Sequence, residues 1–349
     1  MEFLASGGFI GDIQKVEQKV AEENKLSIYP KNSIVFAKSG MSAKKDRVYC
    51  LETDSYVVNH LAIIKPNNEG FLSKFLTYYL QFFKPSKLIQ DESYPSIRIS
   101  DIRNLKFPLP SLSEQKKIVA KLDRAQRLID IDREMLAKYD ELIQSVFLEM
   151  FGDPVTNPKG WEKKELDKFS EVQIGPFGSL LHKEDYIEDG IPLVNPKNII
   201  GSRIIPDGGK TITSKKAKEL GKYILKENDV VLARRGRMGR CAVVTKHEDG
   251  FLCGTGSIII RSELNPTLLS KILSSKSMAS HLEEVANGIT MKNLNSKIVS
   301  GLKIPIPPVE IINQYEEIIT FIDSEKFQQK VFLKNSGELF SSLLQEAFG

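Results

Sequence analysis

Several features that commonly identify a class of protein are scarce or missing in this sequence. Its three cysteines, Cys50, Cys241 and Cys253, are an odd number and form no Cys-X-X-Cys pair, which favours reduced thiols over a disulfide framework. The four histidines are scattered singly, so no metal site is predicted. No apolar run reaches about eighteen residues, and the N-terminus lacks the basic flank and long apolar core of a signal peptide. These absences predict a cytoplasmic protein that does not enter a membrane.

The motifs of common enzyme chemistries are also absent. No phosphate-binding Gly-rich loop occurs, because "GPFGSLLHK" at 175–183 has the wrong Gly-to-Lys spacing. Neither a Gly-X-Ser-X-Gly elbow nor a His-Glu-X-X-His motif is present. An adenine methyltransferase needs an Asn-Pro-Pro-aromatic step, whereas the Asn-Pro pairs here continue with Lys, Lys and Thr. We therefore predict a chain with no catalytic residues of its own.

The sequence does contain enough apolar material for substantial cores. With 349 residues, of which 41% are hydrophobic, the chain is long enough for two or three domains. Runs rich in β-branched residues at 34–37, 230–233 and 257–261 predict strands, and helical patterns lie between such runs, so we predict mixed α/β domains. The formal charge of +4 is compatible with nucleic-acid binding, but many cytoplasmic proteins share it.

An internal repeat is the most informative feature. A Pro-X-Pro step precedes a long helical pattern at Pro108 and again at Pro305, 197 positions later, and the same offset aligns "SVFLEMFG" with "SLLQEAFG" at the ends of the patterns. Upstream, "SIVFAKSG" at 33–40 matches "DVVLARRG" at 229–236. Because proline fixes φ and disfavours helix in the preceding residue, each step predicts a stiff joint. The chain is therefore two copies of a globular part followed by a helix.

The two copies differ at their starts. Residues 153–197 have no counterpart before Met1, so the first globular part is expected to lack its opening segment. We predict a shortened globular domain at 1–107, a spacer helix at 108–152, a second globular domain at 153–304 and a second spacer helix at 305–349.

The two helical patterns carry a heptad seam, which predicts that the helices pair as an antiparallel coiled coil. The predicted seam residues are Ile118, Leu122, Ile129, Asp132, Leu136, Ile143 and Val146 in the first helix and Ile319, Ile322, Lys326, Leu333, Phe340 and Leu343 in the second. Antiparallel pairing puts Asp132 near Lys326 or Gln329, in a polar layer that fixes the register. Alternatively, Asp132 leans to the rim of the pair.

The length of the first helical pattern sets a distance. A helix at 112–150 is about 58 Å long at about 1.5 Å per residue. That length corresponds to roughly 17 base pairs at about 3.4 Å of rise for each.

Basic loops recur at equivalent places in the two copies. "ARRGRMGR" contains four arginines and no acid, and arginine forks match phosphate oxygens and the edge of guanine. The candidate DNA-contacting residues are Arg234, Arg235, Arg237 and Arg240 in this loop, Lys38, Lys44, Lys45 and Arg47 at the matching place, and Ser179, Lys183, Asn195, Lys197, Asn198 and Lys292 in other polar loops. A solvated basic hairpin tip is the alternative interpretation.

These parts, in this order, resemble the specificity subunit of a type I restriction-modification enzyme. The resemblance covers essentially the whole chain and rests on the "FPLPSLSEQKKIVAKLD" entry to the first helix, its "EMFGDP" exit, the following "GW", the "IPIPP" entry to the second helix and its "EAFG" end. "DVVLARRGRMGRCAVV" and "YIEDGIPLVNPKNI" are similar to parts of the family's target recognition domains. The first of these domains resembles one that is shortened at its N-terminus.

The resemblance implies a non-catalytic subunit that recognises a split, asymmetric site in double-stranded DNA, with one half for each target recognition domain. It implies that the helices at 111–151 and 308–348 separate these domains and bind methyltransferase subunits, which use S-adenosylmethionine to methylate adenine. A motor-nuclease subunit that uses ATP and Mg would complete the complex. This chain itself is expected to bind no cofactor.

Three other functions stay open on the sequence alone. The chain is an enzyme with degenerate methyltransferase or nuclease motifs, a scaffold whose repeats bind only protein, or the product of a silent cassette that donates sequence by recombination.

Overall fold

The computed structural model describes residues 18–24, 26–65, 70–178, 180–288 and 292–349. The chain divides into two compact units. Unit 1 comprises residues 1–140 and 323–349, and unit 2 comprises residues 141–322. No helix in the described ranges is long and apolar enough to cross a membrane.

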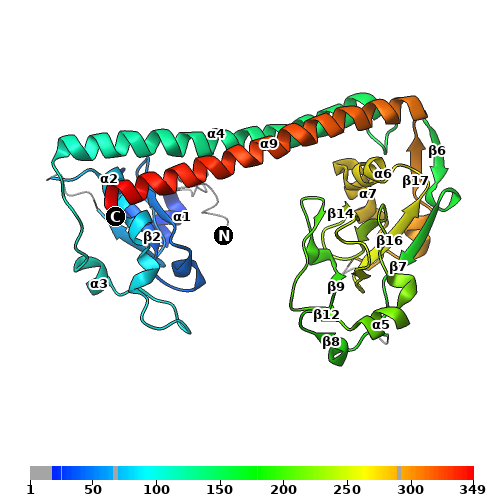
Figure 1. The fold of residues 1–349 in the computed structure, drawn as a ribbon, viewed down its shortest axis with the longest axis horizontal. Helices are drawn as coiled ribbons and strands as arrows, with labels where there is room; N and C mark the ends of the chain where they lie inside the picture. The colour runs from blue at the N-terminus through cyan, green and yellow to red at the C-terminus, as the bar shows by residue number, and fades with distance from the viewer. Residues whose placement is uncertain (1–17, 25, 66–69, 179, 289–291) are drawn as a thin grey trace. The chain divides into compact units, whose positions relative to one another are not determined.

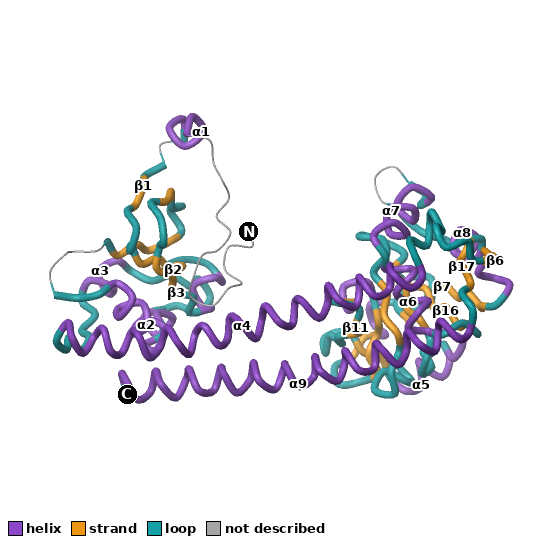
Figure 2. Tube along the Cα trace, turned by 90° about the horizontal axis from the view of Figure 1, so that it is seen from above, coloured by secondary structure: helices purple, strands orange, loops and turns teal. Residues whose placement is uncertain are grey.

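Unit 1 is built on a three-stranded antiparallel sheet in the order β3-β2-β5. Figures 1 and 2 label β2, the central strand of this sheet, and the helix α2. Its elements are α1 (Gln18–Glu23), β1 (Ile28–Tyr29), β2 (Ile34–Ala37), β3 (Val48–Cys50), β4 (Ser55–Tyr56), β5 (Leu61–Ile64), α2 (Ser73–Phe83) and α3 (Ile99–Arg103), with the short 3-10 helices η1 (Met41–Lys45) and η2 (Pro85–Leu88). Strands β1 and β4 form a separate antiparallel pair.

The central strand of this sheet, β2, is buried on both faces because its apolar side chains alternate between two clusters. Ile34 and Phe36 pack with Leu76 of α2. Val35 packs with Tyr49 in the other cluster. Helix α2 therefore covers one face of the sheet, and a second apolar cluster covers the other.

Unit 2 contains two four-stranded sheets, in the orders β14-β13-β16-β7 and β15-β9-β12-β8. Its strands are β6 (Glu162–Glu165), β7 (Ser170–Ile174), β8 (Tyr186–Ile187), β9 (Ile191–Val194), β10 (Ile199–Ile200), β11 (Arg203–Ile204), β12 (Thr211–Ile212), β13 (Val230–Ala233), β14 (Cys241–Val243), β15 (Leu252–Cys253), β16 (Ser257–Ser262) and β17 (Lys303–Ile306). Its helices are α5 (Ser214–Glu219), α6 (Pro266–Ser274), α7 (Lys276–Val285) and α8 (Ser296–Ser300), and its 3-10 helices are η3 (Leu166–Lys168), η4 (Lys183–Asp185), η5 (Pro196–Asn198) and η6 (Gly221–Tyr223).

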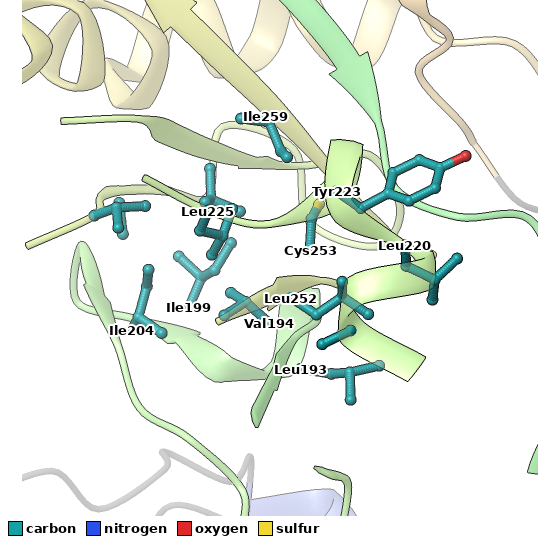
Figure 3. Packing of buried hydrophobic residues seen from close by; sticks show 14 of the residues in the cluster. Leu193, Val194, Ile199, Ile204, Leu220, Tyr223, Leu225, Leu252, Cys253 and Ile259 are labelled. Atoms are coloured by element: carbon teal, nitrogen blue, oxygen red, sulfur yellow. The ribbon is translucent and has the colours of Figure 1, made fainter. Parts of the chain in front are cut away.

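The main core of unit 2 is a continuous apolar cluster to which both sheets contribute (Figure 3). Ile259 of β16 packs in it with Val194 of β9 and with Leu252 and Cys253 of β15. All four side chains are at most 2% exposed. Since burial of one such side chain contributes about 1.5–3 kcal/mol, this cluster fixes one sheet against the other.

The two sheets that contain the basic loops repeat one register. Ile34 pairs with Ile64 in unit 1, and Val230 pairs with Ile260 in unit 2, so both partners are shifted by 196 positions. The internal repeat is therefore a repeat of structure. The hairpin loops differ in length, because residues 38–47 join β2 to β3, whereas the shorter segment 234–240 joins β13 to β14.

The long helices α4 (Leu112–Phe151) and α9 (Val309–Phe348) contribute residues to both units. In unit 1, Lys121 Nζ lies 2.8 Å from Glu346 Oε2, and Gln329 Nε2 donates to Asp132 Oδ1 at 2.7 Å. Residue numbers rise along α4 as they fall along α9, so the predicted antiparallel pairing is confirmed. The Ser111 hydroxyl accepts the amide of Glu114 at 3.2 Å and caps the start of α4.

The thirteen predicted seam residues are all buried or half-buried. Asp132 does not lean to the rim, because it also accepts the hydroxyl of Ser336 at 2.7 Å. Lys326 lies outside this polar layer and pairs with Asp140 instead. In unit 2, the ring of Tyr315, which lies in the same heptad register, packs against Phe151 with 4.9 Å between centroids.

Candidate nucleic-acid interface

In unit 2, the loops that follow three strands converge on the turn 254–256. The amide of Gly254 donates to Val194 O at 2.9 Å, which brings in the loop after β9. The amide of Arg234 donates to Gly256 O at 2.9 Å, which brings in the loop after β13. The amide of Gly175, after β7, donates to Ser257 O at 3.0 Å. Three strand ends therefore meet at one turn.

Glycine is required where these loops cross. A Cβ atom on Gly175 would lie 2.0 Å from Gly254 O, and one on Gly254 would lie 2.3 Å from the side-chain oxygen of Asn195. Both contacts are far inside van der Waals distance. A side chain at position 175 would force two backbone segments apart, and one at position 254 would displace the side chain of Asn195. Gly178, later in the same loop, has open space around it.

The loop at 234–240, the arginine loop, is held by inward-facing residues and presents outward-facing ones. Arg234 is 5% exposed, and its Nε donates to Asn293 Oδ1 at 2.9 Å and to Leu294 O at 3.1 Å. Desolvation lowers the pKa of this guanidinium from its ordinary value. Met238 is 2% exposed and anchors the far side of the loop. Arg234 therefore holds the loop in place, although the sequence made it a candidate for DNA contact.

The remaining arginines of the loop are more accessible. Arg235 and Arg237 are exposed, and Arg240 is half-buried. The Nε atom of Arg240 is buried and has no hydrogen-bond partner within the described ranges. Arg235 pairs with Asn293 in an antiparallel bridge, which brings the arginine loop beside the segment that contains Lys292. Lys292 is exposed, and its ammonium donates to Glu283 O at 2.7 Å.

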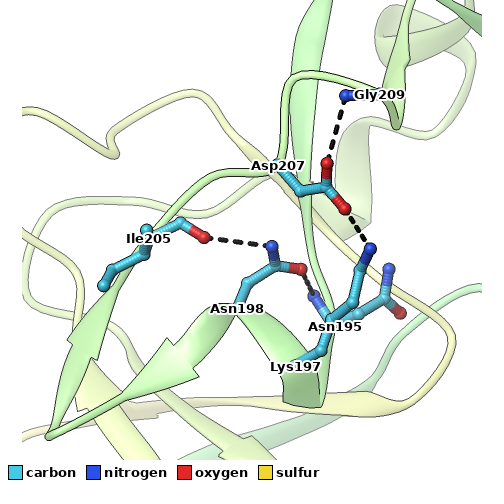
Figure 4. A network of polar contacts seen from close by, with 6 residues as sticks. All are labelled: Asn195, Lys197, Asn198, Ile205, Asp207 and Gly209. Carbon is cyan, nitrogen blue, oxygen red and sulfur yellow. Dashed lines mark hydrogen bonds and ion pairs between the residues drawn. The ribbon is translucent and has the colours of Figure 1, made fainter. Parts of the chain in front are cut away.

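The candidates after β9 form a local network that Figure 4 shows. Asn198 is 3% exposed, accepts the Asn195 amide at 3.0 Å and donates to Ile205 O at 3.0 Å. Lys197 pairs with Asp207, and this ion pair lowers the pKa of the Asp207 carboxyl. Asn198 thus shapes the loop, while Asn195 is half-buried against the turn at Gly254.

The loop after β7 adds a residue that the sequence did not single out. Phe177 is 61% exposed, two residues beyond the tight crossing at Gly175. The available signal in the sequence was a large apolar residue in the short Gly/Pro-rich segment "GPFG". Lys183 is exposed at the start of η4, and Ser179 lies outside the described residues.

Unit 1 presents its basic hairpin at the equivalent place. The amide of Ile97 donates to Lys38 O at 2.8 Å, as that of Leu294 donates to Arg234 O in unit 2. Asp46 anchors the tip by accepting the amide and hydroxyl of Ser86 at 2.7 and 2.8 Å. The candidates differ in accessibility, since Lys45 and Arg47 are exposed, Lys38 is half-buried, and Lys44 lies 3.4 Å from Glu92.

The protein is thus a modular α/β chain in which a duplicated sheet presents a basic hairpin loop and an antiparallel helix pair connects the copies. No group of three or more His, Cys, Asp or Glu residues in the described ranges is arranged to hold a metal ion. The chain belongs to the family of type I restriction modification DNA specificity domains, whose model matches residues 2–138 and 158–330. As a specificity component it is the non-catalytic part of such a system.

Similar proteins carry the same description. The type I restriction enzyme MjaIX specificity subunit of Methanocaldococcus jannaschii is 26% identical over 53% of this chain and 44% of its own length. The EcoBI specificity subunit of Escherichia coli is 21% identical over 92% of this chain and 73% of its own length. The chain thus spans less than half of the first relative and about three quarters of the second.

One solved structure has a similar fold. It comes from a study of complex assembly and conformational transition in a type I R-M system. It has a TM-score of 0.58 and 18% identity and covers 92% of this chain and 83% of that chain.

Proposed function

We propose that this chain recognises DNA sequence for a type I restriction-modification complex, and that the converging loops of unit 2 make the main DNA contacts. The observation that carries the proposal is the division of labour in the arginine loop. Arg234 and Met238 fix the loop, and Arg235 and Arg237 are left exposed. A loop whose position is fixed before binding loses little conformational entropy on contact with a ligand.

The exposed groups suit two kinds of DNA contact. Arginine binds phosphates as a cation and guanine as a bidentate donor, so Arg235 and Arg237 contribute salt-dependent affinity, sequence discrimination, or both. Phe177 offers an apolar surface that stacks on a base or inserts between base steps. Lys292 and Lys183 add positive charge from neighbouring loops.

Each unit is proposed to recognise one part of a split site. Lys45 and Arg47 of unit 1 occupy the hairpin that corresponds to the arginine loop. The two hairpins differ in length and sequence, so the two parts of the site are expected to differ, which makes the site asymmetric. We expect α4 and α9 to set the spacing between these parts, since each helix contains residues of both units.

The helix pair is also the proposed binding surface for partner subunits. In unit 1, α4 exposes Leu128, Ile131 and Met135, at helical spacing that places them on one face. Phe332 and Leu339 form a similar stripe on α9, at 56% and 45% exposure. Exposed apolar stripes of this kind commonly mark protein interfaces. We assign them to methyltransferase subunits that supply S-adenosylmethionine chemistry, and assembly with an ATP- and Mg-dependent motor-nuclease would follow in the cytoplasm.

The experiment that tests DNA recognition is the double change Arg235→Ala and Arg237→Ala in the assembled complex. If both arginines contact phosphates, the slope of log affinity against log salt for a random-sequence duplex should fall by about two. If they contact guanine, the variant complex should accept more bases at one or two positions of its site. Selection of bound duplexes from a library of random sequences would show this change. Lys215→Ala with Lys218→Ala on α5 is the matched control, because both lysines are exposed and the charge change is equal. Equal effects in both pairs would refute the proposal.

A further inference from the structure

The hairpin loops of the two units follow the same path at their starts. Ser39 pairs with Ser96 in an antiparallel bridge. At the equivalent positions of unit 2, Arg235 pairs with Asn293 in a bridge of the same kind. The next residue in each loop is a glycine with positive φ, at 71° in unit 1 and 77° in unit 2. Positions 39–41 can therefore be compared directly with positions 235–237.

The side chains at these positions differ in chemistry. Unit 2 presents the exposed guanidinium groups of Arg235 and Arg237. Unit 1 has Ser39, which is half-buried, and Met41, which is 67% exposed. A thioether carries no charge and donates no hydrogen bond. Unit 1 therefore cannot make at Met41 the contact with phosphate or guanine that we propose for Arg237.

A second large side chain lies exposed on the segment beside this loop. Tyr94 is 79% exposed, and Asp91 Oδ1 fixes the turn that carries it by accepting two backbone amides at 2.8 and 3.3 Å. The amide of Gly40 donates to Pro95 O at 2.9 Å. Met41 and Tyr94 are the chain neighbours of these two bonded residues, so they lie on adjacent stretches of backbone. We call them the apolar pair.

The charges around the apolar pair suit DNA. Lys45 and Arg47 of the same hairpin are exposed, and neither forms an ion pair within the described ranges. Of the nearby acids, Glu92 lies 3.4 Å from Lys44 Nζ, and Asp91 is engaged in its turn. Cations beside the apolar pair would hold it against a phosphate backbone.

We propose that the apolar pair contacts the C5-methyl groups of thymine in the part of the site that unit 1 recognises. This inference rests on the DNA-recognition function proposed above and specifies the chemistry of one contact. In the major groove, the methyl group of thymine is the apolar feature that distinguishes base edges, and apolar side chains contact it. The arginines at the equivalent positions of unit 2 suit guanine or phosphate instead. The two units thus differ in the kind of base edge that they accept.

Replacement of thymine by uracil tests this inference, because uracil lacks only the C5-methyl group. The assembled complex is titrated with duplexes of its recognised sequence, identified by mapping methylated adenines in cells, in which each thymine in turn is replaced by uracil. Uracil at a contacted position should weaken binding by about three- to fivefold, which corresponds to the loss of one buried methyl group. Uracil outside the recognised sequence is the control and should have no effect.

Two variants assign this effect to the apolar pair. Met41→Ala with Tyr94→Ala should bind the thymine duplex about tenfold more weakly and should no longer distinguish uracil from thymine. Met41→Leu with Tyr94→Phe keeps the apolar surface and should retain the discrimination. Ile28→Ala on β1 is the matched control, at 59% exposure in the same unit, and should behave like the unchanged chain.

Three results would overturn the inference. Equal affinity for all thymine and uracil duplexes would exclude a contact with the methyl group, and it would also be the result if the apolar pair inserts between base steps. Discrimination that persists in the double alanine variant would place the contact elsewhere. Failure of that variant to assemble with partner subunits would assign the apolar pair to a protein interface.

The same titrations separate this inference from the DNA-recognition proposal. A complex that binds its own sequence no better than a random duplex would refute both. A complex that binds its sequence specifically but ignores the methyl groups would refute only the contact by Met41 and Tyr94.

Discussion

Asp229 in unit 2 and Ser33 in unit 1 occupy equivalent positions just before the central strand of each sheet. Both are buried, and both donate their amide to the carbonyl three residues earlier. Asp229 forms an ion pair with Arg261 at 3.1 Å, whereas the Ser33 hydroxyl donates to Pro30 O at 2.7 Å. The same backbone turn is thus held by a buried charge pair in one unit and by a hydroxyl in the other.

This comparison separates what the fold needs from what it tolerates. The register of the paired strands is identical, because the apolar residues of β2 and β13 are buried in both units. The polar groups around that frame differ freely, including the hairpin loops that we propose to contact DNA. Because the buried strands keep their register, the sequence of a hairpin loop can change while the sheet that carries the loop stays the same.

The largest expected effect on stability comes from adding a methyl group at the crowded loop crossing of unit 2, compared with the same change at an open position of the same loop. Gly175→Ala should destabilise unit 2 by more than about 3 kcal/mol, because the new Cβ meets a backbone oxygen that cannot rotate away. Gly178→Ala, in the same loop but with open space, should change stability by less than about 0.5 kcal/mol. Urea unfolding followed by Trp161 fluorescence reports unit 2, which contains the only tryptophan. Equal stabilities of the two variants would contradict the close packing of the loops at Gly175.

A somewhat smaller loss of stability is expected when the arginine of the buried ion pair in unit 2 is replaced. The equivalent residue of unit 1 provides the comparison. Arg261→Met should destabilise unit 2 by about 2–3 kcal/mol at neutral pH, since Asp229 would stay buried without its partner. Lys65→Met, the equivalent change in unit 1, removes an exposed lysine near the Tyr29 ring and should cost less than about 0.5 kcal/mol. Calorimetric scans of both variants compare the two units directly.

The pH dependence of the Arg261→Met variant sharpens this test. Burial raises the pKa of the Asp229 carboxyl even with Arg261 and the Lys226 amide lowering it. Loss of Arg261 should raise it further, so the folded state would hold the proton more tightly than the unfolded state. The destabilisation should therefore grow as pH rises above the ordinary range of aspartate and shrink on acidification. A pH-independent loss would show that Asp229 is not its source.

The smallest predicted effect concerns the helix pair. Gly337 lies inside α9 with nothing near the position of its missing Cβ. Gly337→Ala should therefore stabilise unit 1 by slightly under about 1 kcal/mol through helix propensity. A loss of thermal stability would mean that this position requires glycine.

Local pattern was sufficient to predict the large elements of this protein. The heptad spacing predicted the helix pair, and the repeated apolar runs predicted the central strands. Asp132 was expected to lie near Lys326 or Gln329; it accepts from Gln329 and also from Ser336, whereas Lys326 pairs with Asp140. Heptad positions define a seam, whereas the rotamers of long polar side chains depend on neighbours that the pattern does not contain.

The candidate site was less predictable, for a physical reason. Four arginines in seven residues read alike in sequence, yet Arg234 faces inward because Asn293 and Leu294, about sixty positions later, supply its acceptors. The amide of Asn198, a candidate for DNA contact, donates to Ile205 O within its own loop, which the sequence pattern does not indicate. A single aromatic residue such as Phe177 carries no periodicity, so the sequence pattern does not indicate its exposure. Long-range pairing decides each of these cases.

The most direct test of the account is a map of methylated adenines in cells that express this chain with its partner subunits. The account predicts that Arg235→Ala with Arg237→Ala relaxes one part of the recognised sequence, and that Lys45→Ala with Arg47→Ala relaxes a different part. Relaxation of the same bases by both pairs, or an unchanged map with either pair, would contradict it.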